Sequence, residues 1–76
     1  MSPVTIDAHL VETVERHVNA SIDDKALLQQ VATECPLASL REISRAALYA
    51  ATDVSREDVR VSARLYYFAM NVRKAV

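Results

Sequence analysis

The chain contains no glycine in 76 residues, and this absence limits the available folds more than any other feature. Glycine reaches the left-handed backbone conformation of tight hairpin turns at no steric cost, so a β-rich fold is disfavoured. Phosphate-binding loops, nucleophile elbows and dinucleotide fingerprints also need glycine where the backbone turns sharply or approaches a ligand. The sequence therefore predicts helices joined by short turns, and it disfavours these nucleotide-binding and hydrolase classes.

The length predicts one domain, residues 1–76, with room for one small hydrophobic core. At this size, folding buries only about 60% of the surface that the unfolded chain exposes, so a disulfide, a metal or a partner often adds stability. The single cysteine, Cys35, cannot form an internal disulfide, and His9 and His17 do not have a zinc-binding spacing. We therefore expect association with another chain, and no metal, cofactor or small-molecule substrate.

The composition, 51% hydrophobic and 25% charged, is too apolar for a disordered chain. The first ten residues lack the basic start and apolar run of a targeting signal. No stretch approaches the roughly 18 to 20 apolar residues that a membrane span needs. We expect a folded, cytoplasmic protein with no membrane partner.

Helix signals predict two helices in the first half of the chain. Thr5 is suited to cap a first helix over residues 6 to 18. Asn19, the best substitute for glycine in a left-handed C-cap, then ends it. Ser21 begins a second helix that ends near Glu34.

Two further helices are predicted in the second half. Pro36 interrupts the pattern because proline lacks an N–H and disfavours helical geometry in the residue before it. A third helix runs from Pro36 or Ser39 to Ala51, and a fourth begins at Ser55 and extends to Arg73. The predicted fold is an all-α bundle of four short helices, of which the last is the longest.

The first three predicted helices each carry one apolar stripe, which is typical of a helix that packs one face on a core. The expected core residues are Ile6, Leu10, Val11, Val14 and Val18 in the first helix, Leu27, Leu28, Val31, Ala32 and Cys35 in the second, and Leu37, Leu40, Ile43, Ala47, Leu48 and Ala51 in the third.

The fourth helix is apolar over more than half of its circumference. A helix of this kind is central in a bundle or lies at an interface, although a compact wrap that hides both faces is the alternative. We expect one row to face the core and the other to meet a second chain, with the reverse assignment left open. The expected inner row is Val61, Leu65, Phe68 and Val72, and the outer row is Val59, Ala63, Tyr66 and Met70.

Two further tyrosines complete the predicted partner interface. Tyr49 projects beside Arg45 and Glu42 on the polar side of the third helix, a composition that recognition surfaces favour, although single exposed tyrosines are common. Tyr67 follows Tyr66 in the last helix. The predicted interface residues are Tyr49, Val59, Tyr66, Tyr67 and Met70.

The net charge of −1 hides an uneven distribution. Residues 1–38 hold six acids and two bases, a net of −4, whereas residues 39–76 hold four acids and seven bases, a net of +3. The two halves can attract each other within one chain or across a dimer. Alternatively, a cationic stripe of the last helix could follow nucleic-acid phosphates, although the sequence pI of about 6.0 argues against this. The candidate nucleic-acid contacts are Arg60, Arg64, Asn71 and Lys74.

Only His9, His17 and Cys35 could serve as a nucleophile or an acid–base catalyst, and no arrangement around them indicates a reaction. His17 projects beside apolar residues, where a hydrogen-bonded, partly buried histidine is common, and Cys35 is expected to be a small buried hydrophobe. We predict no catalytic residue. The sequence favours a non-enzymatic interaction protein that acts as an adaptor, regulator or inhibitor, either as a homodimer or on a different target protein, with a small DNA- or RNA-binding regulator as the alternative.

Overall fold

The computed structural model describes residues 7–21, 23–53 and 58–74 of the chain. Within these ranges every regular element is a helix, namely α1 (Ala8–Val18), α2 (Asp24–Glu34), α3 (Leu40–Ala51) and α4 (Val59–Lys74). The predicted all-α bundle of four short helices is confirmed, and α4, with 16 residues, is the longest. None of the helices in these ranges is long and apolar enough to cross a membrane.

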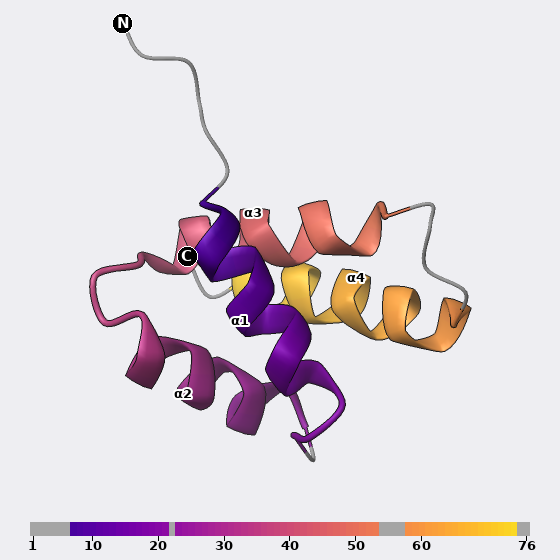
Figure 1. The fold of residues 1–76 in the computed structure, drawn as a ribbon, viewed down its shortest axis with the longest axis horizontal. Helices are drawn as coiled ribbons and strands as arrows, with labels where there is room; N and C mark the ends of the chain where they lie inside the picture. The colour runs from indigo at the N-terminus through magenta and orange to yellow at the C-terminus, as the bar shows by residue number, and fades with distance from the viewer. Residues whose placement is uncertain (1–6, 22, 54–57, 75–76) are drawn as a thin grey trace, which may run out of the picture.

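Helices α3 and α4 lie side by side and run in opposite directions, and α1 crosses this pair on one face (Figure 1). Helix α2 turns back from α1 and packs on both α1 and α4. Helix α4 therefore contacts all three of the other helices, which is the central position that its wide apolar arc predicts.

The core lies between α1 and the α3–α4 pair. Leu65 and Phe68 of α4 are fully buried, as expected for its inner row, and Val61 is half-buried. The buried apolar residues are Leu10, Val11, Val14 and Val18 of α1, Leu27 and Val31 of α2, Ile43, Ala46, Ala47 and Ala50 of α3, and Leu65, Phe68, Ala69 and Val72 of α4.

Three residues expected in the core are on the surface. Leu37 is 97% exposed because α3 begins only at Leu40, so Leu37 lies in the preceding turn, where helical periodicity does not apply. Leu40 itself is partly exposed in the first turn, and Ala32 is exposed on α2. Ala46 and Ala50 fill the inner face of α3 instead.

Capping side chains mark where the helices begin. At α3, Ser39 and Glu42 form a capping box, because Ser39 Oγ accepts from the Glu42 N–H at 3.1 Å and Glu42 Oε1 accepts from the Ser39 N–H at 3.0 Å. The Ser39 hydrogen bonds hold the pKa of Glu42 below its ordinary value. This cap fixes the start of α3 at Leu40 and not at Pro36.

The starts predicted for the other helices are displaced. Asp7, and not Thr5, caps α1, and Asp23, and not Ser21, caps α2 by accepting from Ala26 N–H at 2.8 Å. Helix α4 begins after Asp58, whose carboxylate accepts from the Arg60 N–H at 3.0 Å. Both Thr5 and Ser55 lie outside the described residues.

The helix ends avoid left-handed backbone throughout the described ranges, where no residue has a positive φ. Asn19 does follow the last residue of α1, as predicted, but its φ of −83° is right-handed. Its N–H donates to the His17 carbonyl, and the Ala20 and Ser21 N–H groups donate there too. A chain without glycine thus ends this helix in tight right-handed turns.

Candidate interaction surface

The outer row of α4 is exposed along much of its length. Val59 is 74% exposed and Tyr66 is 48% exposed, whereas Met70 is half-buried against the core. Residues that recur at this helical spacing share one side of the helix. These three predicted interface residues therefore share one side of α4, which is exposed at Val59 and Tyr66 and meets the edge of the core at Met70.

Tyr67 lies beside this row and pairs with Tyr66. The two rings meet edge to face, with centroids 5.8 Å apart and planes at 76°. Edge-to-face pairs of this kind are energetically favourable. Since Tyr67 is 65% exposed, the pair presents a large, partly ordered aromatic surface.

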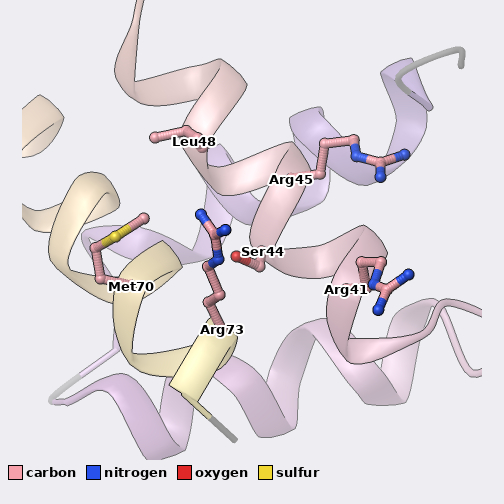
Figure 2. Close-up of a pocket in the computed structure, with 6 residues that line it drawn as sticks. All are labelled: Arg41, Ser44, Arg45, Leu48, Met70 and Arg73. Carbon is pink, nitrogen blue, oxygen red and sulfur yellow. The ribbon is translucent and has the colours of Figure 1, made fainter. Parts of the chain in front are cut away.

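The outer row borders a groove between α3 and α4, which we call the α3–α4 groove. It has a volume of about 500 Å³ and opens on the face of the helix pair away from α1 (Figure 2). Leu48 and Met70 supply apolar side chains to it, and Arg73 reaches across it toward Ser44 (Figure 2). The groove is lined by Arg41, Ser44, Arg45, Leu48, Met70 and Arg73.

A buried hydrogen bond fixes the two walls of this groove. Ser44 Oγ donates to the main-chain carbonyl of Ala69 at 2.8 Å, and both residues are buried. Because serine has a short side chain, this bond requires the backbones of α3 and α4 to approach closely. The small residues of both helices at this point, among them Ala47 and Ala69, allow the approach.

Three arginines contribute to the lining of the groove. In Figure 2, the Arg73 guanidinium from α4 lies over the groove near Ser44, whereas the side chains of Arg41 and Arg45 extend from the other side of α3, away from Leu48 and Met70. No hydrogen bond or ion pair links any of the three to another described residue. The groove therefore has Leu48 and Met70 as its apolar side chains, Arg73 over them, and two further arginines at its α3 edge.

The other flank of α4 carries the stripe predicted to contact nucleic acid, and the chain itself uses much of it. Arg64 donates to the Ser21 carbonyl at 2.5 Å, and Asn71 donates to the Asp24 carboxylate. Arg60 pairs with Asp58 at 3.3 Å. Lys74 is exposed at the end of the helix. These contacts leave the stripe with less unpaired charge than the sequence suggests.

Tyr49 does not join the outer row of α4. It is 59% exposed and lies in the crevice between α1 and α3, beside Val11 and Ala50. Four of the five predicted interface residues thus cluster on α4, and Tyr49 belongs to a different surface.

Two of the side chains considered for catalysis, His17 and Cys35, make contacts that join helices. His17 Nε2 and Arg16 both contact Glu34, which joins the end of α1 to the end of α2. The hydrogen bond from His17 is the largest cause of a lowered Glu34 pKa. Cys35 is half-buried, with its Sγ 3.8 Å from the buried Thr13 hydroxyl. Among the described residues, no cluster of three or more His, Cys, Asp and Glu side chains could hold a metal.

The sequence analysis missed the α3 side of the groove. Leu48 was assigned to the core, against which it does pack, Arg45 was placed beside Tyr49, and Arg41 and Arg73 were assigned to no surface. A signal was present, since Arg41, Arg45 and Leu48 share one side of α3 at spacings of four and three. Compared with known proteins, the chain matches no family model, no curated protein and no solved structure.

Proposed function

We propose that this chain is a small, non-enzymatic protein–protein interaction module that acts as an adaptor, regulator or inhibitor by occupying a partner's surface. The observation that carries the proposal is the exposed outer row of α4, formed by Val59, Tyr66 and Met70 beside the α3–α4 groove. An apolar and aromatic row next to a concave surface is what interface centres usually contain.

The size of the domain supports the same proposal. A chain of 76 residues has a small core, and its buried apolar residues are mostly valine, leucine and alanine. Covering the outer row with a second chain would bury additional apolar area and so add stability. Self-association as a homodimer is the simplest source of that cover, and a different protein is the other.

The aromatic pair is suited to act as an anchor. Tyrosine supplies a large contact area at a low cost in side-chain entropy, and it is enriched among the residues that dominate binding energy. Because Tyr66 and Tyr67 already contact each other, part of the entropic cost of ordering them is met before binding. A cytoplasmic setting is part of the proposal, and the unpaired thiol of Cys35 fits it.

The test is association measured by sedimentation, first alone and then with proteins recovered from the host. Tyr66→Ala should weaken association about tenfold or more, because truncating an aromatic anchor commonly costs 1.4 kcal/mol or more. Met70→Ala should have a smaller effect. Leu37→Ala is the matched control, since Leu37 is an exposed leucine outside this surface. Circular dichroism should show that helicity is retained.

The proposal fails if the chain stays monomeric at every concentration and recovers no partner. It also fails if Leu37→Ala weakens association as much as Tyr66→Ala. Salt-sensitive binding to mixed DNA, with no protein partner, would favour the nucleic-acid alternative instead.

A further inference from the structure

We infer that the α3–α4 groove binds an acidic amphipathic helix from another protein, with its apolar ridge on Leu48 and Met70 and its carboxylates on Arg41, Arg45 and Arg73. This inference rests on the proposed function and specifies the chemistry of the partner.

Two antiparallel helices leave a groove on each side of the plane that contains them. On one side, α1 packs across α3 and α4 through Leu10, Val14 and Val18. The α3–α4 groove is on the other side, and no described helix covers it. A helix that lies in such a groove uses residues spaced three and four apart. The molecule therefore shows the kind of element that this helix pair accepts, because α1 is an amphipathic helix of the same type.

The charge around the groove selects an acidic occupant. Other arginines of the chain have acceptors nearby, since Arg16 contacts Glu34, Arg60 contacts Asp58 and Arg64 donates to the Ser21 carbonyl. The three arginines of the groove have no such partner among the described residues.

Glu42 does not neutralise the groove. Its carboxylate is engaged by the capping box with Ser39, and the charge of Arg45 makes only a small contribution to its lowered pKa. Guanidinium groups form forked hydrogen bonds with carboxylates, so a partner with acidic side chains would gain specificity as well as attraction.

The apolar floor argues for a helix in preference to a nucleic acid. Phosphates could approach the arginines, but they offer nothing to cover Leu48, Met70 and the neighbouring Tyr66 ring. An amphipathic helix can cover the apolar side chains with one stripe and reach the arginines with the residues beside that stripe.

A second copy of the chain is a poorer occupant. The apolar face of its acidic helix α1 is already buried, through Leu10, Val14 and Val18, so α1 of a second copy has no ridge to offer. A symmetric dimer formed groove to groove would place two sets of unpaired arginines in one small interface, where like charges repel. Salt therefore separates the two occupants, since screening weakens an acidic complex and strengthens a dimer with like-charged walls.

The experiment is fluorescence anisotropy with the full chain and three labelled synthetic peptides. The first peptide is an amphipathic helix with a leucine ridge spaced three and four apart and glutamates on both sides of it. The second has lysine in place of each glutamate, and the third has serine in place of each leucine. We expect the first peptide to bind, with affinity that falls as salt rises, and the other two to bind at least about tenfold more weakly.

Variants of the chain locate the binding site. Arg45→Glu or Arg73→Glu should each weaken binding of the glutamate peptide about fivefold, and the two together by more, because each removes an exposed ion pair and adds a repulsion. Lys25→Glu makes the same change of charge on the exposed face of α2 and should leave binding unchanged. Circular dichroism checks that each variant remains folded.

Several results would overturn the inference. Equal binding of the serine peptide would mean that charge alone is recognised, and tighter binding of a DNA duplex at the same arginines would identify a phosphate-binding surface. Failure of all three peptides to bind, while Tyr66→Ala still weakens association, would remove the inference and leave the proposed function intact. Association that strengthens with salt and is not displaced by the glutamate peptide would assign the groove to a second copy.

Discussion

Both flanks of α4 carry arginine side chains, but the flanks differ in the hydrogen-bond acceptors that the rest of the described chain provides. On the α2 flank, Arg64 donates to the Ser21 carbonyl at 2.5 Å and Asn71 donates to Asp24. On the α3 flank, Arg73 reaches toward Ser44, and no described residue is linked to its guanidinium by a hydrogen bond or an ion pair (Figure 2). The difference shows that basic residues of one helix can have acceptors within the described chain on one flank and none on the other.

The uneven distribution of charge along the sequence accompanies this difference. Residues 1–38 have a net charge of −4 and supply the acceptors on the α2 flank, which include the Asp24 carboxylate. Residues 39–76 have a net charge of +3, and α3 therefore adds arginines to the other flank. Among the described residues, hydrogen bonds from Arg64 and Asn71 join the two halves on the α2 flank, whereas each ion pair lies within one half of the chain.

The largest effect on stability should come from truncating the buried side chain that lies between the two flanks of α4. Phe68 is fully buried at the centre of α4, so Phe68→Ala should lower the free energy of unfolding by about 3 to 5 kcal/mol through lost burial and a residual cavity. Denaturant unfolding followed by circular dichroism measures the change. Tyr67→Ala, an exposed aromatic in the same turn, is the control and should cost far less. Equal losses would mean that the core is wrongly assigned.

The sharpest test of the comparison pairs one arginine from each flank. Arg64→Ala should lower the free energy of unfolding by about 1 to 2 kcal/mol, because a half-buried charged hydrogen bond to a carbonyl is lost. Arg73→Ala should change it by less than about 0.5 kcal/mol, as expected for an exposed side chain with no hydrogen bond or ion pair to a described residue. Chemical denaturation of both variants under the same conditions gives the difference. If both variants lose the same stability, the two flanks do not differ as described.

The bond that sets the width of the groove should have a smaller effect on stability. Ser44→Ala removes the donor to the Ala69 carbonyl, and the expected loss is about 1 kcal/mol. The variant should also weaken whatever association Tyr66 supports, since the walls of the groove would no longer be held at the same separation. Ser62→Ala, a half-buried serine of α4, serves as the comparison in the same unfolding and sedimentation measurements. If the Ser44→Ala variant has unchanged stability and association, this hydrogen bond does not set the separation of the two groove walls.

Periodicity predicted the helices and the inner row of α4 because burial in a bundle follows the helical repeat, as Leu65 and Phe68 show. It failed for Leu37, since the repeat has no meaning before the cap at Ser39. The outer row could be predicted because it lies on a single helix. The groove could not, because it depends on which side of α3 faces α4, and that packing arrangement is set by contacts such as the one from Ser44 to Ala69.

The smallest effect should come from the contact that holds α2 in place for its bonds to α4. The Glu34 carboxylate pairs with Arg16 and His17 of α1. The hydrogen bond from His17 holds the pKa of Glu34 below its ordinary value near 4.5. Because the pKa is lower in the folded state, the carboxylate contributes stability above about pH 4.5, and this contribution is lost as the pH falls through the lower folded value. Glu34→Gln should therefore flatten the acid limb of a stability–pH profile, whereas Glu12→Gln on the exposed face of α1 should not. Amide exchange read by NMR should show the loss in α2 before it appears in the α3–α4 pair, and simultaneous loss in all helices would mean that the two flanks of α4 are not held independently.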